Sequence, residues 1–127
     1  MQSKQAVSPK SGREPINSWT WNGAKRQANR LGLLVWAEPP CVGRYSPEAT
    51  ARFEAQLAPM VVRDGNHPSI VMWGIYNEEW ELDWRTAEDS EKQEAVRRAY
   101  NYLASLDRSR PIIDDSGWSH VKTDILD

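Results

Sequence analysis

The sequence predicts an α/β fold in which parallel strands alternate with helices, as in part of a (β/α)8 barrel. Short, continuous apolar runs begin near residues 33, 70 and 112, and stretches with a helical apolar period lie between them. Continuous apolarity is typical of strands that are covered on both faces, as in parallel sheets. Each run is followed by acidic residues, which suits the carboxyl ends of barrel strands.

Three helices are predicted between the apolar runs. The first covers residues 22–31, where Gly32 is well placed to end it. The second begins at Ser46, whose hydroxyl suits an N-cap, with Pro47 at the first helical position. The third covers residues 90–106. The apolar residues expected to face the core are Phe53, Leu57, Met60 and Val61 in the second helix, and Val96, Ala99, Tyr100, Leu103 and Leu106 in the third.

The predicted strands are residues 33–37, 69–76 and the run that begins at Pro111, with residues 123–126 as a candidate fourth. A doubly wound sheet would show the same alternation. However, no G-x-G-x-x-G or phosphate-binding loop follows any of these strands, so no nucleotide cofactor is expected.

The composition argues against nucleic-acid-binding, disulfide-stabilised and membrane-spanning classes of protein. The chain has 127 residues and a formal net charge of -2, without the basic patch that a nucleic-acid or anionic-membrane partner would need. Its one cysteine, Cys41, cannot form an internal disulfide, and no apolar run approaches the ~20 residues of a membrane span. Residues 1–20 are predicted to be a disordered or foreign leader that lacks the apolar core of a signal peptide, and residues 21–127 to be the folded segment.

Acidic residues follow all three predicted strands: Glu38 after the first, Glu78 and Glu79 after the second, and Asp114 and Asp115 after the third. Neighbouring strands lie about 4.8 Å apart, so these carboxyl groups should crowd one edge of the sheet. Crowded carboxylates raise one another's pKa, as a general acid near neutral pH requires. Helix capping and simple solvation are the alternative interpretations of such acids.

Two further features bear on chemistry at this edge. Glu78 and Glu79 should point to opposite faces, because adjacent strand residues do, so any catalytic partner of Glu78 must come from another strand. The chain contains seven tryptophans and one phenylalanine, and Trp118 follows a strand end beside Gly117. Trp118 is therefore a candidate for stacking on a sugar ring, with ordinary packing as the alternative.

The segments RLGLLVWAEPP and RDGNHPSIVMWGIYNEEW resemble glycoside hydrolase family 2, which includes β-galactosidases, β-glucuronidases and β-mannosidases. The resemblance rests on an Asn-His-Pro-Ser turn at residues 66–69 that leads into a strand ending in Asn77-Glu78. The later LDRSRPIIDDSGW is also similar to the family, and the resemblance covers residues 30–127.

This resemblance implies that the chain carries roughly strands 3 to 5 or 6 of the catalytic barrel of a retaining exo-β-glycosidase. It implies that Glu78 is the acid/base and that Asn77 binds the 2-hydroxyl of a β-glycoside substrate, with Glu38, Asp115 and Trp118 as further substrate-binding candidates. The family's nucleophile lies on a later strand, so this chain alone is expected to be inactive without the remaining barrel strands and the β-sandwich domains.

Two other functions stay open at this point. A non-catalytic carbohydrate-binding or degenerate barrel would keep the same acids and Trp118 at one edge. A metal-dependent hydrolase could instead use Glu38, Asp115 and His120, although their spacing lacks the regularity of known ligand motifs, and no metal is expected.

Overall fold

The computed structural model describes residues 18–40 and 43–127, with side chains from residue 23 onward, and within them helices and strands alternate as predicted. The predicted leader therefore falls almost entirely outside the described residues. The elements are α1 (Ser18–Leu31), β1 (Val35–Ala37), α2 (Pro47–Asp64), β2 (Ile70–Asn77), the 3-10 turns η1 (Trp80–Leu82) and η2 (Thr86–Glu88), α3 (Ser90–Leu106) and β3 (Ile112–Ser116).

The three strands form one open, parallel sheet in the order β1-β2-β3. Tyr76 pairs with Asp115 and Asn77 with Ser116, so β2 and β3 end side by side. The pairing of β1 with β2 is irregular between Val35 and Trp36. Because all strands run the same way, their carboxyl ends share one edge of the sheet, here called the carboxyl edge. The parallel sheet is thus confirmed.

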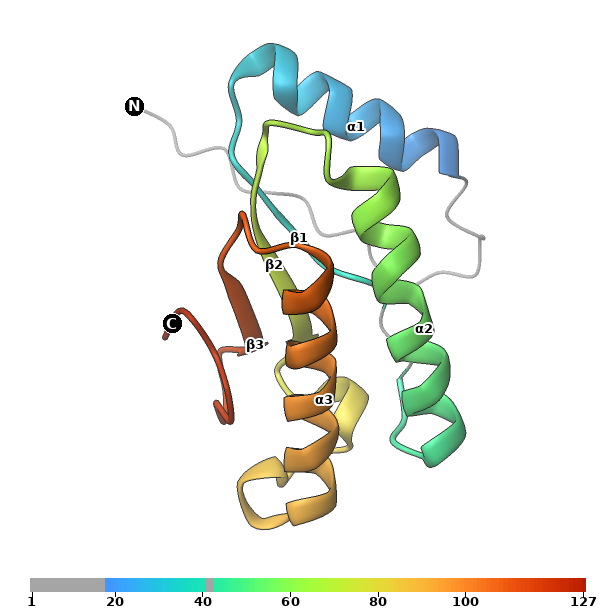
Figure 1. Cartoon of the computed structure of the whole chain (residues 1–127), viewed down its shortest axis with the longest axis vertical. Helices are drawn as coiled ribbons and strands as arrows, with labels where there is room; N and C mark the ends of the chain where they lie inside the picture. The colour runs from blue at the N-terminus through green and yellow to red at the C-terminus, as the bar shows by residue number, and fades with distance from the viewer. Residues whose placement is uncertain (1–17, 41–42) are drawn as a thin grey trace.

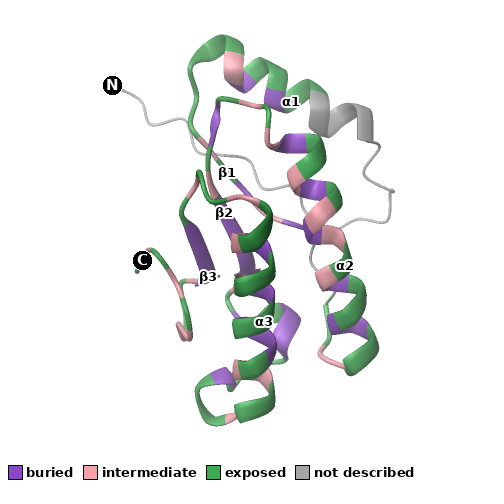
Figure 2. Cartoon of the chain, viewed as in Figure 1, coloured by how far each residue is buried: buried purple, intermediate pink, exposed green. Residues whose placement is uncertain are grey.

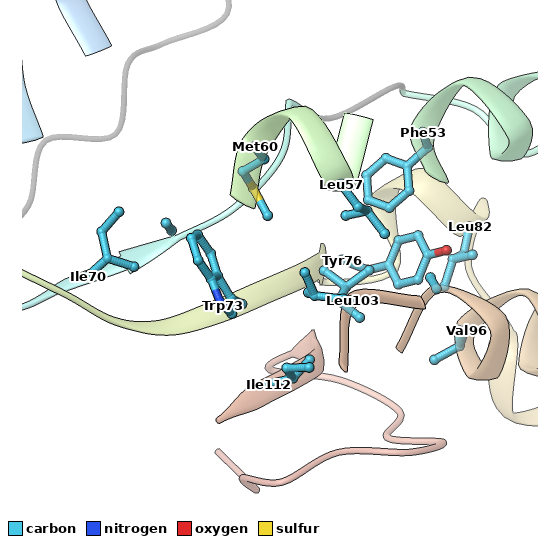
Figure 3. Packing of buried hydrophobic residues seen from close by; sticks show 13 residues of the cluster. Phe53, Leu57, Met60, Ile70, Trp73, Tyr76, Leu82, Val96, Leu103 and Ile112 are labelled. Atoms are coloured by element: carbon cyan, nitrogen blue, oxygen red, sulfur yellow. The ribbon is translucent and has the colours of Figure 1, made fainter. Parts of the chain in front are cut away.

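Helices α2 and α3 run side by side along the strands (Figure 1) and enclose most of the core. An ion pair between Arg98 and Glu54 joins the two helices at their surface, with 3.2 Å between nitrogen and oxygen. Within the core the ring of Tyr76 stacks on Phe53 with centroids 4.8 Å apart, and Trp73 is fully buried (Figure 3). Figure 2 shows that buried residues follow the strands and the facing sides of these helices.

Local sequence signals set most of the boundaries. The hydroxyl of Ser46 accepts the N–H of Ala49 at 3.1 Å, which caps α2 as expected. Gly32 has a φ of 65°, a left-handed conformation that suits the end of α1. Helix α3 spans the predicted residues, and the carboxylate of Asp89 caps it. Helix α1 begins four residues earlier than predicted, at Ser18.

The Asn-His-Pro-Ser turn before β2 is held by one residue of α1. The side-chain oxygen of Asn29 accepts the N–H of Ser69 at 2.9 Å, and its nitrogen lies 2.9 Å from Nδ1 of His67. A single amide side chain therefore joins the C-terminal end of α1 to the start of β2.

Three predictions differ from the structure. Strand β1 begins at Val35, because Leu33 and Leu34 are exposed and precede the pairing with β2. Leu106 is exposed at the end of α3 and does not continue its buried stripe. Residues 123–126 form no strand, because the N–H and the carboxylate of Asp124 both bind the backbone of Ile112 at the start of β3.

No helix in the described part of the chain is long and apolar enough to cross a membrane.

Candidate active site at the carboxyl edge

Glu38, which follows β1, lies against the middle of β2 at Gly74. A methyl group built at Gly74 would meet the indole nitrogen of Trp36 at 2.2 Å and the side chain of Glu38 at 2.7 Å. Only glycine leaves room for both side chains, which explains why a residue without a side chain interrupts the most apolar strand. Gly74 thereby allows Glu38 to lie against β2, three residues before the last residue of that strand, Asn77.

Glu78 and Glu79 differ sharply in exposure, although not for the predicted reason. Strand β2 ends at Asn77, and both glutamates have left-handed backbones, with φ of 52° and 58°. Glu78 is exposed at the carboxyl edge, whereas Glu79 is buried and its N–H donates to Oδ1 of Asp115 at 3.0 Å. Two left-handed residues, rather than strand alternation, therefore separate the carboxylates.

Residues 78–86 form a loop that is anchored by four buried residues, Glu79, Glu81, Leu82 and Thr86. Oε2 of Glu81 accepts the N–H of Asn77 at 3.1 Å, and the carboxylate of Glu79 accepts the N–H of Thr86 at 3.3 Å. Leu82 is buried in the core cluster. Exposed positions between these anchors carry Trp80 and Trp84, which were not among the predicted site residues although they follow the predicted acid within six residues.

The same loop stores backbone strain. Besides the two glutamates, Asp83, Trp84 and Arg85 have positive φ, with values of 54°, 62° and 64°. Such conformations cost about 1 kcal/mol or more for residues other than glycine, and they persist only where the surrounding structure holds them. Strain of this kind concentrates at functional sites, which makes this loop a candidate part of the active site.

Acids crowd the carboxyl edge, as predicted. Burial raises the pKa of Glu38 to about 7, and the carboxylate of Glu81 adds to this effect. Burial also raises the pKa of Asp115 to about 7; the N–H of Glu79 opposes the shift, while the carboxylates of Glu79 and Asp114 reinforce it. The charges that act on Glu38 and Asp115 thus include Glu81, which follows no strand directly and was not predicted at this edge.

Replacing Asp115 with Asn should change how stability depends on pH. The raised pKa means that the folded chain binds this proton more tightly, so the free energy of unfolding should fall as pH rises from about 4 to about 7. Asn keeps an oxygen for the N–H of Glu79 and carries no charge, so the variant should be about 1–3 kcal/mol more stable at pH 8. Urea unfolding at pH 5 and 8 measures this, with exposed Glu94→Gln as the control. An unchanged pH dependence in Asp115→Asn would contradict the assignment.

The other predicted substrate-binding residues occupy different environments at this edge. Asn77 is half-buried, and Oγ of Ser116 lies 3.5 Å from its side-chain oxygen. Trp118 is exposed, and its ring makes an edge contact with Trp84 at 5.7 Å. Asp115 is fully buried, which suits support of Glu79 better than contact with a sugar.

Residues 28–127 match the barrel domain of the glycosyl hydrolases, described as family 2, TIM barrel domain. The chain belongs to this family. The predicted resemblance is thereby confirmed, and both the turn at residues 66–69 and the Asn77-Glu78 pair lie within the matched residues. The sheet, α2 and α3 form part of a family 2 barrel.

Curated relatives of this family 2 chain are named as β-glucuronidases. A provisionally named β-glucuronidase of Formosa agariphila is 34% identical over 89 residues, which cover 67% of this chain and 11% of that protein. The β-glucuronidase of Streptococcus agalactiae is 37% identical over 71 residues, covering 42% of this chain and 12% of that protein. The chain thus spans about a tenth of the length of these relatives.

Solved structures agree with this assignment. The β-glucuronidase of Parabacteroides merdae is 28% identical with a TM-score of 0.59, over 69% of this chain and 11% of that one. A family 2 β-galacturonidase of Eisenbergiella tayi bound to galacturonate is 26% identical with a TM-score of 0.58, over 69% of this chain and 16% of that one. The resemblance is thus to β-glucuronidases rather than to the β-galactosidases also considered from the sequence.

His120 does not join Glu38 and Asp115 in a metal site. Its Nδ1 lies 2.7 Å from the carboxylate of Asp114, and its Nε2 lies 3.4 Å from Asp127 without hydrogen-bond geometry. Asp114 also accepts the N–H groups of Val121 and Lys122 and so holds the chain after β3. Among the residues that the structure describes, no three His, Cys, Asp or Glu side chains are arranged to hold a metal ion.

Proposed function

We propose that this chain supplies the acid/base part of a retaining exo-β-glycosidase, with β-glucuronides as the first substrate class to consider. The observation that carries the proposal is the exposed carboxyl of Glu78, directly after Asn77 at the carboxyl end of β2 in a family 2 barrel. Chemistry in such barrels takes place at this end of the strands. The named β-glucuronidases among the relatives support the substrate class.

Glu78 would act twice in this reaction. A nucleophilic carboxylate attacks the anomeric carbon while Glu78 gives its proton to the departing glycosidic oxygen, which releases the leaving group as an alcohol. Glu78, now a carboxylate, then takes a proton from water as the water oxygen attacks the anomeric carbon and frees the enzyme nucleophile. Only one carboxyl oxygen of Glu78, Oε2, is bound by a described side chain, the indole N–H of Trp80.

Asn77 and Glu38 are proposed to orient the sugar. A hydrogen bond from Asn77 to the 2-hydroxyl would strengthen as positive charge develops at the anomeric carbon, and so would favour the transition state. Asn77 is held for this role through its backbone N–H, which donates to Glu81. Glu38 lies over Gly74, where its carboxyl can accept from a sugar hydroxyl. We assign Asp115 to support of the loop rather than to contact with the sugar.

The nucleophile is expected from a strand of the barrel outside this chain, about 5 Å from Glu78 across the sugar. The test compares the 127-residue chain with a complete barrel that contains it, on nitrophenyl β-glucuronide, β-galacturonide, β-galactoside and β-mannoside. We expect turnover by the complete barrel, fastest on the glucuronide and with retained anomeric configuration by NMR, and none by the chain alone.

Two results would contradict this function. Binding of a glycoside without turnover by the complete barrel would favour a non-catalytic carbohydrate-binding barrel. Turnover by the 127-residue chain that survives Glu78→Gln would show that other residues carry the chemistry. Faster turnover of the galactoside or mannoside would keep the mechanism and replace the substrate class.

A further inference from the structure

Three exposed tryptophans, here called the tryptophan cluster, gather at the carboxyl edge of the sheet. The rings of Trp80 and Trp84 have centroids 6.4 Å apart, and those of Trp84 and Trp118 lie 5.7 Å apart at an interplanar angle of 71°. About half of each residue is exposed: 52% for Trp80, 45% for Trp84 and 53% for Trp118. Large apolar side chains that gather on a surface, rather than scatter over it, mark a binding site.

The backbone that carries the cluster is held by hydrogen bonds to Glu79 and Lys92 and by a turn at Gly117. The N–H of Trp84 donates to the carbonyl of Glu79 at 3.3 Å, and Nζ of Lys92 donates to the carbonyl of Trp84 at 2.7 Å. Trp118 follows Gly117, whose φ of 74° turns the chain at the end of β3. A fixed backbone lowers the entropy lost when a ligand binds, so these rings are suited to recognition.

The cluster borders the carboxyl group of Glu78. The indole N–H of Trp80 donates to Oε2 of Glu78 at 3.2 Å, and a carbon built on Gly117, next to Trp118, would lie 3.8 Å from Cγ of Glu78. An acid at Glu78 would protonate the oxygen that joins the sugar to its leaving group. A ring attached to that oxygen would therefore lie within reach of the cluster.

We propose that the tryptophan cluster binds the ring of an aromatic leaving group, so that aryl β-glycosides are the substrates it selects. This inference rests on the proposed function, because it places the leaving group by the position of Glu78. The near-perpendicular rings of Trp84 and Trp118 offer one face and one edge to a flat ring, which are the two arrangements that aromatic pairs favour.

Polar groups around the cluster argue against a sugar as the leaving group. A hydroxylated ring needs several hydrogen-bond partners as well as a stacking surface. The N–H of Trp80 is occupied by Glu78, and the guanidinium of Arg85 donates two hydrogen bonds to Glu88, at 2.9 and 3.0 Å. The three indole rings themselves present apolar faces and edges, which match an aryl ring better than a second sugar.

The test measures binding by NMR of the indole N–H signals in the 127-residue chain. Phenyl and methyl β-D-glucuronide carry the same sugar, so any difference between them reports the leaving group. We expect phenyl glucuronide to shift the signals of Trp80, Trp84 and Trp118 and to bind about tenfold more tightly than methyl glucuronide, since two ring contacts contribute about this much. Trp84→Ala should abolish the difference, and Tyr102→Ala, an exposed aromatic on α3, should preserve it.

The buried indole of Trp73 reports whether each variant is folded, and Trp84→Phe keeps a ring at the site if Trp84→Ala does not fold. Equal affinity for the two glycosides, unshifted cluster signals, or a β-glucuronyl disaccharide that shifts them when phenyl glucuronide does not would each overturn the proposal. Because no hydrolysis is measured, these outcomes are independent of Glu78 as acid/base. The variant Glu78→Gln should retain ring binding, since its amide oxygen still accepts from Trp80.

Discussion

Glu78→Gln, in a complete barrel containing this chain, is expected to lower the rate of sugar transfer from alkyl β-glucuronides by about 10²- to 10⁴-fold, the usual contribution of a general acid. Gln has nearly the same shape and can still accept the indole N–H of Trp80, but it has no proton to give. Glycosides with very acidic leaving groups, such as dinitrophenyl, need little proton assistance and should lose much less. Values of kcat/KM for the two substrates measure the difference, because they report the first chemical step.

The matched control for this variant is Asp83→Asn. Asp83 is an exposed acid on the same loop with a left-handed backbone that Asn tolerates, so its replacement should leave both rates unchanged. An equal loss of kcat/KM for alkyl and dinitrophenyl glucuronides in Glu78→Gln would rule out an acid role. An equal loss in Asp83→Asn would point to the loop as a whole rather than to one carboxyl group.

Arg110→Ala is expected to lower the free energy of unfolding by about 3–5 kcal/mol, since it removes the cationic partner of Asp107 together with hydrogen bonds to two backbone carbonyls. The guanidinium of Arg110 donates to the carbonyls of Ile70 and Gly65 and to the carboxylate of Asp107, each at 2.7 Å. It also lies 5.4 Å from the centroid of the Trp73 ring. One side chain thereby joins the end of α2, the start of β2 and the segment after α3.

Urea unfolding followed by circular dichroism measures this loss. Arg97→Ala is the control, because Arg97 is exposed and its closest approach to Glu94 is 3.7 Å, so less than about 1 kcal/mol should be lost. Arg110→Lys should fall between the two, because it keeps the charge but cannot reach all three partners. A loss in Arg110→Ala no larger than in Arg97→Ala would show that the three elements are held by the core alone.

At the amino ends of β2 and β3, Asp107 should make the free energy of unfolding depend on pH in the opposite direction to Asp115. Burial opposes ionisation of Asp107, but hydrogen bonds from Ser109, Trp73 and Arg110 outweigh it and hold its pKa well below the usual range. The stability that Asp107 contributes is therefore complete above about pH 4 and is lost as the pH falls further toward its own pKa. Acid should loosen this end of the sheet, whereas alkali should loosen the carboxyl edge.

Elements with a strong local signal could be predicted from the sequence. Ser46 and Pro47 fixed the start of α2, and the run that contains Trp73 identified β2, because capping and continuous apolarity are decided by nearby residues. Residues 123–126 were mispredicted because Asp124 is bound to Ile112, a contact that a local pattern cannot reveal. The end of α1 was predicted correctly from Gly32 alone.

The candidate site was predictable in its location but not in its arrangement. Parallel strands made it certain that Glu38 and Glu78 would share an edge. The burial of Glu79 and Glu81 depends on consecutive residues with left-handed backbones. Such residues are rare outside glycine, and the residue types at 77–84 do not predict them. The role of Asp115 as a buried acceptor for Glu79 follows from that loop and was hidden for the same reason.

The Arg110 contacts and the loop after β2 lie at opposite ends of the same strand, and this separation affects how such a protein can change over evolution. Ile70, which Arg110 binds, begins β2, and the loop with Trp80 and Trp84 follows its last residue. Substitutions at distant sites without shared partners act nearly independently. Under the proposed function, the rings beside Glu78 could therefore be exchanged for other side chains, and other leaving groups accommodated, while the fold keeps the stability that its other end provides.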